Sequence, residues 1–528
     1  MIQRLLTGIG VVFLVLAAIV AVTGGLETSV GGVPISATSA ARLLFEGAVL
    51  LLIGMLVSPT PRRGALVACI ALFLVAAAAD SEPRRVGDGF EYLGMARNLS
   101  RLAPPSLAEA EFGALTAEMA SHGDTSWDSA PLRSLRGEDG RYDFPHFWLL
   151  SLVAAPLVGI AAAAGLHPAM GFTALNILLL LGATLLLVRR GAAMAAVAFA
   201  ATMLWWVDKA HAEMFIAVTA GAGVLLLQTA PVVSLLLLGA AAAQMPVMAV
   251  LLAAGVVVAV LRERTRRIVA AAVIASAIAA LHPLYYLWRL GVTSPLRNTV
   301  IPHVPGVREV ITPLVDLNLG VIWFAPVLCV LTIVGLALAA RRREWAVLTV
   351  SLLGAITLLA AATQTPNVNH GGTPGMSRYG VWLLALLLPL AVRAETGLRW
   401  PRGVPTLAIC ATVAFAAFVL PPRKLDSGVG PDPTQLARLV WTLAPTLDNP
   451  LPEVFTERVT HIDGIGARPV ATGGCTKALV IARAGEDMKW PEGCVPRAVP
   501  PECAMPGTLC YASGGEFDVA PKQPGFLR

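Results

Sequence analysis

The sequence predicts an all-α protein that crosses a membrane many times, and two observations lead to this fold class. Of its 528 residues, 56% are hydrophobic and only 14% are charged, which is too little charge to cover a soluble domain of this size. Apolar runs of about 17 to 22 residues recur along most of the chain, close to the roughly 20 residues with which a helix spans the hydrocarbon core. The net charge of +6 does not indicate nucleic-acid binding, because the arginines cluster in short loops beside apolar runs.

These runs predict about thirteen transmembrane helices. The first is expected to be a retained helix rather than a cleaved signal, because it is long for a signal core and no small-residue cleavage site follows it. The run 233–260 is too long for one upright helix and contains Gln244 and Pro246, so we expect it to be tilted, kinked or broken there. The expected spans are 5–23, 42–57, 64–80, 146–164, 171–188, 192–207, 214–230, 233–260, 268–288, 319–340, 345–362, 379–392 and 404–420.

The short arginine-rich loops predict the orientation, because such loops favour the cytoplasmic side. Four of them, 59–64, 262–267, 341–344 and 393–403, fall on one side when the spans are counted alternately. The N-terminus is then cytoplasmic in a plasma membrane, the inner membrane of a bacterium. The segments expected outside are 80–145, 289–318, 364–378 and everything after 420.

One pair of arginines disagrees with this count. Arg189 and Arg190 would fall outside. Either two spans between 146 and 207 are wrongly drawn, or these side chains face a lipid phosphate. The same count places the polar segment 208–213, "DKAHAE", in the cytoplasm as an ordinary loop.

The tail after residue 420 carries four of the seven cysteines, Cys475, Cys494, Cys503 and Cys510. Outside the cytoplasm this number predicts two disulfides, with three connectivities open. A zinc site is the alternative, but there is no tight CxxC pair and the nearby histidine is His461. The turns of the tail indicate little regular secondary structure.

The outer loop 80–145 is rich in acidic residues, including Asp80, Glu82, Asp88 and Glu91. A helical spacing of apolar side chains from Tyr92 to Ala103 predicts a short amphipathic helix that lies in the membrane interface. Asp88 precedes this helix and Glu91 follows three residues later, a capping-box pattern. A capping carboxylate can also face a cleft, so both roles stay open.

Four stretches, in this order, resemble the GT-C superfamily of polyprenyl-phosphate-sugar-dependent membrane glycosyltransferases, in particular glycosyltransferase family 39. The first is the acidic "DGFEYLGMARNL" after an apolar run, and the second is "GRYDFPHFWLLSLVAAPL" (140–157). The others are "ALNILLLLGATLLLVRRG" (174–191) and "NHGGTPGMSRYGVWLLALLLPL" (369–390). The resemblance covers roughly 80–390, and the family's adjacent acidic pair is not present as such. It divides the chain into an added N-terminal hairpin, 1–63, a GT-C-like membrane domain, 64–420, and an outer tail domain, 421–528.

The resemblance implies a hexosyl- or pentosyltransferase that moves a sugar from a polyprenyl phosphate to a glycolipid, polysaccharide or protein acceptor outside the cytoplasm. It implies Asp88 as the base that accepts the acceptor's proton, with Asp80 as the second candidate. Cations must neutralise the phosphate leaving group. The implied substrate-binding residues are Glu91, Tyr92, His146, His370, Arg378 and Tyr379, with Arg289, Arg297, His303 and Arg308 as further candidates.

Several of these residues have structural alternatives. Arg378 and Tyr379 can anchor a helix end to headgroups, His370 can be an ordinary loop residue, and His146 can pack at the interface. No metal site is expected from ligand spacing, although a divalent cation, Mg²⁺ or Mn²⁺, is compatible with the implied chemistry.

The alternative functional class is a transporter or flippase for a lipid-linked intermediate, and a non-catalytic relative is a third reading. A transporter is expected to carry ionisable residues at mid-membrane and a repeated half. Here the acidic residues avoid the span centres and no internal repeat is recognisable. The sequence therefore favours the enzyme.

Overall fold

The computed structural model describes residues 87–124, 135–296, 303–364, 375–401, 432–462 and 467–481, with shorter stretches within 5–54, 403–412 and 494–519. It is mostly helical, and four helices are long and apolar enough to cross a membrane: Met170–Arg189, Arg266–Leu290, Trp345–Thr363 and Arg378–Gly397. The mainly helical fold class is confirmed to this extent. The full set of about thirteen spans and the three-part division at 63 and 420 stay predictions.

The chain forms two compact units. Unit 1 comprises 1–297, 325–357 and 382–418, and unit 2 comprises 298–324, 358–381 and 419–528. Within unit 1, the segment expected between the first two spans contains an antiparallel hairpin of β1 (Leu26–Val30) and β2 (Val33–Ala37).

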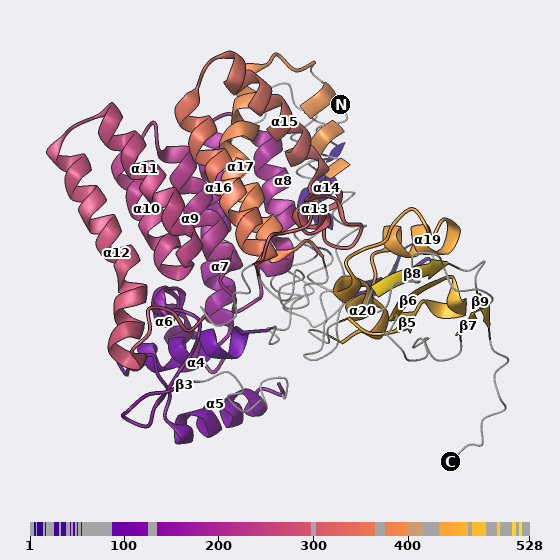
Figure 1. Cartoon of the computed structure of the whole chain (residues 1–528), viewed down its shortest axis with the longest axis horizontal. Coiled ribbons are helices and arrows are strands. Elements are labelled where there is room, and N and C mark those ends of the chain that lie inside the picture. The colour runs from indigo at the N-terminus through magenta and orange to yellow at the C-terminus, as the bar shows by residue number, and fades with distance from the viewer. Residues whose placement is uncertain are drawn as a thin grey trace. The chain divides into compact units, whose positions relative to one another are not determined.

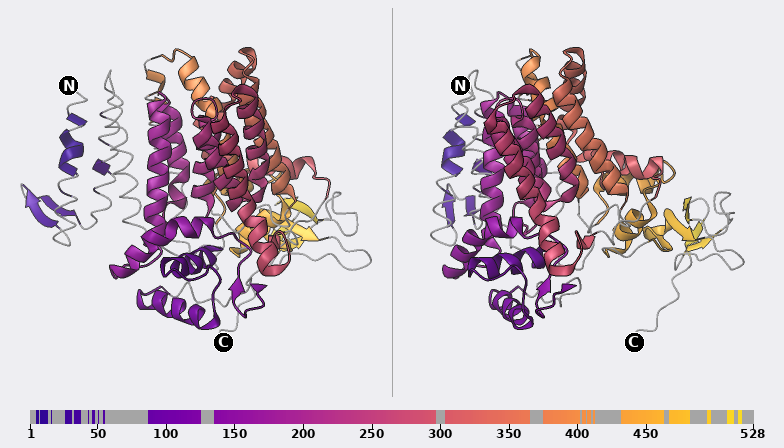
Figure 2. Two further views of the ribbon diagram at one scale, coloured as in Figure 1. Left: turned by 90° about the vertical axis from the view of Figure 1, so that its left-hand side faces the viewer. Right: turned by 60° about the vertical axis from the view of Figure 1, so that its left-hand side comes forward.

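Unit 1 is built around a bundle of helices that run back and forth between two ends (Figures 1 and 2). Its helices include α7 (Met170–Arg189), α8 (Ala193–Met203), α9 (Glu213–Leu226), α10 (Pro231–Gln244), α11 (Ala249–Arg262), α12 (Arg266–Leu290) and α15 (Pro326–Arg341). Parts of α16 (Trp345–Thr363) and α17 (Arg378–Gly397) complete it. We call the end that carries Asp88, Gln244 and Arg289 the near end and the opposite one the far end.

Small residues let these helices approach backbone to backbone. A methyl group added at Gly221 of α9 would lie 2.9 Å from the carbonyl oxygen of Ala385 in α17. One added at Gly239 of α10 would lie 2.7 Å from the carbonyl oxygen of Ala275 in α12, and one at Gly335 of α15 would overlap the backbone of α17. Close crossing at small residues is the packing mode of membrane helices, which lack a hydrophobic drive toward one another.

The long run 233–260 is two helices, so of the three predicted forms the broken one is correct. α10 ends at Gln244, Met245 is extended, and η2 (Pro246–Met248) leads into α11. Pro246 cannot continue a helical hydrogen-bond ladder. The Gln244 side chain instead accepts from the backbone N–H of Leu150 (2.8 Å) and donates to the carbonyl of Phe147 (2.9 Å).

Helix α6 (Leu149–Ala163), expected as a span, lies across the near end of the bundle (Figure 2). Its first turn meets the last residue of α10 through the Leu150–Gln244 hydrogen bond. Its middle meets the first turn of α7, where a methyl group at Gly171 would overlap the backbone of Val158. A helix that touches two helix ends on the same side of the bundle does not cross it, so this span prediction is wrong.

This correction removes the disagreement over Arg189 and Arg190. With α6 at the near end, α7 runs to the far end, and Arg190 donates there to the hydroxyl of Thr229. The other arginine-rich turns of unit 1 lie at the far end too (Figure 1). Arg393, for example, pairs with Glu344 at 2.5 Å. Helix α8 then returns, so segment 208–213 lies at the near end rather than opposite the outer loop.

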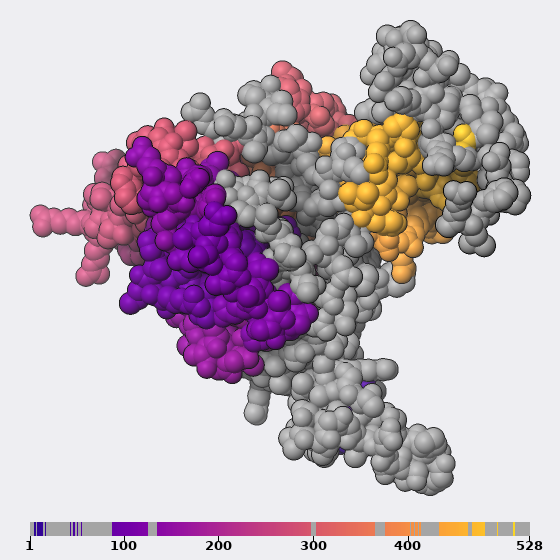
Figure 3. Space-filling view, turned by 90° about the horizontal axis from the view of Figure 1, so that it is seen from below, coloured from indigo at the N-terminus to yellow at the C-terminus, as the bar shows by residue number. Residues whose placement is uncertain are grey.

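Helix α4 (Gly89–Ser100) forms where a helix was expected, but its environment differs from the prediction. Phe90, Tyr92, Leu93 and Met95 are buried, and so is most of the face expected to be polar, including Glu91 and Asn98. The Asn98 amide donates to the carbonyl of Ser106 (3.0 Å) and to Glu111 (2.9 Å) of α5 (Glu109–Ser121). Helix α4 is therefore packed between α5 and α6, and the indigo-to-purple segment that contains α5 forms part of the surface seen in Figure 3.

Unit 2 contains more regular structure than the tail sequence indicated. Its helices are α13 (Val307–Val315), α14 (Val321–Phe324), α19 (Gln435–Leu443) and α20 (Pro452–Thr460). An antiparallel sheet has the order β5 (Val470–Ala471), β6 (Lys477–Ile481), β8 (Leu509–Ser513), and β7 (Cys494–Pro496) pairs with β9 (Phe517–Val519). Trp441 of α19 and Phe455 of α20 form its core with Ala437, Val470 and Leu479.

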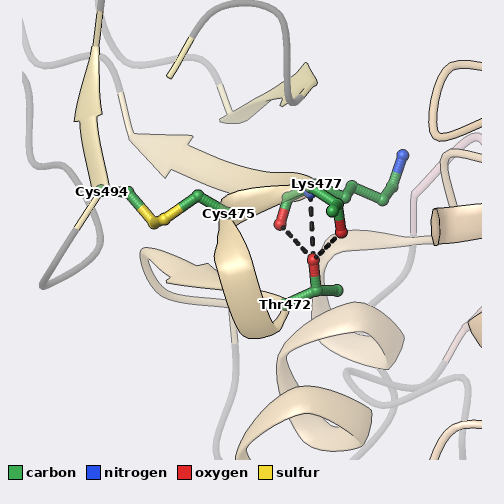
Figure 4. Close-up of a disulfide and its surroundings, with 5 residues drawn as sticks. Thr472, Cys475, Lys477 and Cys494 are labelled. Atoms are coloured by element: carbon green, nitrogen blue, oxygen red, sulfur yellow. Dashed lines mark hydrogen bonds between the residues drawn. A yellow bond between two sulfur atoms is a disulfide. The ribbon is translucent and has the colours of Figure 1, made fainter. Parts of the chain in front are cut away.

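Cys475 and Cys494, two of the four cysteines for which disulfides were expected, form a disulfide with a sequence separation of 19 (Figure 4). Beside it, the Thr472 hydroxyl accepts from the backbone N–H of Lys477 (3.0 Å) and donates to its carbonyl (3.2 Å). Cys510 is disulfide-bonded as well. Cys503 lies outside the described residues.

Replacing Cys475 and Cys494 together by serine is expected to destabilise unit 2 by about 3 kcal/mol, because the unfolded chain regains the entropy of a loop of this length. Thermal unfolding of wild type and the double variant, followed by tail-specific limited proteolysis, measures the loss. Cys329→Ser, at the unpaired cysteine of α15, is the control and should leave the tail's protease resistance unchanged. Equal resistance in all three proteins would contradict the prediction.

Asp316, between α13 and α14, predicts a pH dependence of unit 2. Burial raises the pKa of its carboxyl to about 6, and the nearby Asp448 acts in the same direction. The folded state therefore holds a proton that the unfolded state releases near pH 4, so stability falls as pH rises from about 4 to about 6. Asp316→Asn keeps an oxygen for the N–H groups of Asn318 and Leu319 and should flatten this slope. Unfolding temperatures across pH 4–7 test it, and an unchanged slope in the variant would contradict it.

Candidate functional site

Asp88 lies at the N-cap position of α4, but its side chain makes no capping hydrogen bond. The capping-box interpretation is therefore wrong. The residue is 8% exposed, and its Oδ2 faces two imidazoles. Nε2 of His146 lies 3.4 Å away and Nε2 of His211 lies 3.7 Å away. Both distances are long for an N–H···O bond, and they are short enough for the three groups to interact electrostatically.

The Nδ1 atom of each imidazole, on the opposite side of the ring from Asp88, contacts a glutamate. Nδ1 of His146 lies 2.8 Å from Oε2 of Glu91, and Nδ1 of His211 contacts Oε2 of Glu213. A carboxylate on Nδ1 fixes the ring orientation and turns Nε2 toward its target. The result is a chain of five ionisable side chains, Glu91–His146–Asp88–His211–Glu213, centred on one carboxylate.

Three segments far apart in the sequence bring this chain together. Asp88 and Glu91 come from α4, His146 from the turn before α6, and His211 and Glu213 from the start of α9. The ring of Tyr92 lies 5.6 Å from both imidazole rings. Since α4 packs along α6 and its Tyr92 carbonyl accepts from the Ser151 hydroxyl (2.9 Å), the first two segments are fixed to each other.

The third segment is held by Asn176 of α7, which is fully buried. Its amide nitrogen donates to the carbonyls of Trp206 (3.1 Å), Val207 (3.2 Å) and Lys209 (2.9 Å). These carbonyls belong to the last residue of η1 (Leu204–Trp206) and to the non-helical stretch between η1 and α9. The Trp206 carbonyl also accepts from the backbone N–H of Lys209 (3.3 Å). Asn176 thus sets the path of the chain into His211.

Lys209 brings a buried positive charge to the same stretch. It is 2% exposed, its ammonium group lies 2.7 Å from Asp208 Oδ1, and it stands 5.2 Å from the centre of the Trp205 ring. A buried lysine needs such a partner to remain charged. Segment 208–213, expected as an ordinary polar loop in the cytoplasm, is therefore buried and belongs to the site.

Asp88, Glu91 and His146 can each offer one ligand atom such that all three atoms lie within 4.8 Å of one another. Two carboxylates and an imidazole suit Mn²⁺ and related divalent cations. The group is also held together by its own charges and hydrogen bonds, so its geometry is consistent with a cation without requiring one.

A second polar cluster surrounds Arg289 at the end of α12. The guanidinium group pairs with Asp139 (2.9 Å) and Asp143 (2.8 Å), and the Tyr285 hydroxyl donates to Asp143 (2.5 Å). The hydrogen bond from Arg289 lowers the pKa of the Asp139 carboxyl to about 2. This cluster ties the 135–143 segment to α12, and because two carboxylates face one guanidinium group it has no surplus positive charge for a phosphate.

The structure brings together the predicted residues Asp88, Glu91, Tyr92 and His146. Asp80, His370 and Arg297 lie outside the described residues. Arg378, half-buried, and Tyr379, buried, begin α17 in unit 2. His303 pairs with Glu309 (3.1 Å), and Arg308 donates to the carbonyl of Pro450 (3.1 Å), both within unit 2.

His211 and Glu213 are the site residues that sequence reasoning missed. Their polar segment was noticed, but the miscounted α6 placed it on the opposite side of the membrane from Asp88. The misplaced Arg189 and Arg190 were the signal that could have corrected the count. No protein-family model, curated protein or solved structure matches this chain.

Proposed function

We propose that the protein is an integral membrane glycosyltransferase that moves a sugar from a polyprenyl phosphate to an acceptor outside the cytoplasm. The observation that supports this best is a buried carboxylate, Asp88, set between two glutamate-held imidazoles at one end of an apolar helix bundle. A lipid-borne donor and a polar acceptor can meet only where lipid and water adjoin. The end of a membrane bundle is such a place.

In this proposal Asp88 takes the proton from the acceptor hydroxyl while the oxygen bonds to the anomeric carbon. The bond from that carbon to the phosphate oxygen breaks, and its electron pair leaves with the polyprenyl phosphate. The imidazoles of His146 and His211 lie beside Oδ2 of Asp88 and act on this carboxylate electrostatically. Glu91 and Glu213 hold the two rings so that the Nε2 atoms of the histidines face that oxygen.

The orientation follows from the arginines under the same proposal. The far end of unit 1, which holds Arg190 and Arg393, is cytoplasmic, and the near end with Asp88 is outside. Arg378, Tyr379 and His370 remain the candidates for the donor phosphate, and Asp80 remains the second candidate base. If a divalent cation takes part, Asp88, Glu91 and His146 would hold it.

The alternative is a transporter or flippase for a lipid-linked intermediate, since a buried chain of carboxylates and imidazoles can also carry protons. Such relays are expected along the span, whereas this chain lies at the start of α4, before α6 and at the start of α9. The enzyme is therefore the better-supported function. A non-catalytic relative would keep the fold without turnover.

The test is transfer by purified protein in liposomes, from radiolabelled polyprenyl-phosphate sugars to an extract of the protein's own cell envelope. Labelled product that depends on the protein supports the proposal. Folded protein that transfers from none of a panel of hexose and pentose donors would overturn it. Movement of the intact donor across the liposome membrane would then support the transporter.

A further inference from the structure

Helix α19 in unit 2 presents a stripe of exposed leucines. Leu436, Leu439, Leu443 and Leu447 are 37%, 55%, 74% and 80% exposed. Leu436, Leu439 and Leu443, spaced by three and four residues, lie on one side of α19, and Leu447 follows the end of this helix. The core side of α19 is occupied by Ala437 and Trp441, both buried. The exposed leucines therefore do not contribute to the hydrophobic core of unit 2.

Helix α13 of the same unit carries a second stripe, in which Val307, Ile311 and Val315 are spaced by four residues and Val304 precedes the helix. Val304, Val307, Ile311 and Val315 are 93%, 78%, 40% and 46% exposed. The charged residues of α13 point elsewhere. Arg308 donates to the carbonyl of Pro450, and Glu309 accepts from the N–H of Gly306 (2.9 Å). What α13 exposes along this stripe is aliphatic.

The two helices are joined through one loop. Thr434, the N-cap of α19, bonds Asn318 Oδ1 through its N–H (3.1 Å) and the carbonyl of Leu317 through its hydroxyl (2.8 Å). Leu319 in turn accepts from the N–H of Ser377 (3.1 Å), directly before α17. On the other side, Gln364, directly after α16, bonds both the N–H and the carbonyl of His303.

Unit 2 thus includes the last residues of α16 and the first of α17, two of the four helices able to span a membrane. The segments on either side of α13 are hydrogen-bonded to Gln364, directly after α16, and to Ser377, directly before α17. Any bilayer that these helices cross has its surface within reach of α13 and α19. We propose that unit 2 lies on this bilayer, with the stripes of α13 and α19 inserted at the boundary between headgroups and acyl chains.

The composition of the stripes favours lipid over a protein partner. Protein interfaces derive most of their binding energy from Trp, Tyr and Arg, with Leu and Val under-represented, and the stripes contain only Leu, Val and Ile. A specific protein interface also buries roughly 800 Å² per partner, more than one face of a nine-residue helix supplies. Insertion of aliphatic side chains into lipid needs no matching partner surface. Because unit 2 is covalently connected to α16 and α17, it is held at a high local concentration near the bilayer that these helices cross.

Position-specific fluorescence on the full-length protein in liposomes tests this inference. Leu439→Cys places an environment-sensitive dye on the α19 stripe, and Thr442→Cys, on the same helix but off the stripe, is the matched control. Val307→Cys probes α13. Labelled wild type gives the background from unpaired cysteines such as Cys329.

We expect nitroxide lipids labelled near the headgroup to quench the dye at 439 and 307 several-fold more than at 442, and aqueous iodide to show the reverse order. Equal iodide quenching at 439 and 442 would overturn the inference. Protection at 439 that disappears at low protein-to-lipid ratio would also overturn it, because it would assign the stripe to a second copy. The inference does not depend on sugar transfer, so its failure and that of the proposed function are separable.

Discussion

Asp88→Asn is expected to lower sugar transfer by about 10²- to 10⁴-fold, the usual contribution of a general base. The amide preserves the shape of the side chain but cannot accept the proton of the acceptor hydroxyl. It also removes the negative charge that the His146 and His211 imidazoles face at 3.4 and 3.7 Å. Initial rates with a fixed donor concentration in liposomes measure the effect.

Asp124→Asn is the control, because Asp124 lies in the same outer loop and faces a different histidine, His167, at 3.4 Å. It should retain near wild-type transfer. If Asp88→Asn is active and Asp80→Asn is not, the base is Asp80. If both keep wild-type rates in folded protein, the proposed chemistry at this loop is wrong.

Asn176→Leu is expected to destabilise unit 1 by about 2–4 kcal/mol, because it leaves the buried carbonyls of Trp206, Val207 and Lys209 without their shared donor. The leucine fills a similar volume, so the loss reports hydrogen bonding more than packing. Unfolding temperature in one detergent, at one protein-to-detergent ratio, measures it. Sugar transfer should fall as well, since the path of the chain into His211 changes.

Thr184→Val is the matched control on the same helix. The Thr184 hydroxyl is fully buried and, among the described residues, has no hydrogen-bond partner. Replacing it by a methyl group of the same shape should leave stability equal or slightly higher. Equal losses in the two variants would show that α7 tolerates no substitution and that the three carbonyl bonds are not the cause.

Hydropathy predicted the long helices well because their apolar length is a local property. Helices α7, α12 and α16 each begin and end within two residues of an expected span, and α17 extends five residues beyond the end of its expected span. It failed for α6, whose fifteen residues are as apolar as those of its neighbours. The contacts that bury α6 come from Tyr92 and Gln244, residues far from it in sequence. Its direction is therefore a tertiary property that no window of the sequence contains.

Two errors in the predicted number of membrane spans cancelled each other. Residues 146–288 were expected to hold six spans, and six helices, α7 to α12, run between the two ends. The extra span at α6 was offset by drawing α10 and α11 as one. Residues 262–267 and the end of α12 consequently lie at opposite ends of the bundle, as the count expected, and only the segments between the two errors were displaced. These segments held Arg189, Arg190, His211 and Glu213.

The partners of Asp88 were accessible to sequence reasoning only in part. Glu91 and His146 came from motifs near the outer loop, whereas the glutamate-on-Nδ1 arrangement became visible only in three dimensions. The tail was under-predicted for a different reason. Its helices are nine residues long, too short to be stable in isolation, and depend on Trp441 and Phe455 packing on the β5–β6 strands.

The glycine crossings also bear on permeation. Where Gly221 meets Ala385 and Gly335 meets Leu390, two backbones touch and no side chain separates them. A hydrated path needs a gap lined by side chains or exposed backbone, so none can run between α9 and α17, or between α15 and α17, at these levels. Solute passing through unit 1 would first have to pull these helices apart and expose their bare backbones to water. At these two crossings, glycine residues therefore close the helix bundle to water and solute.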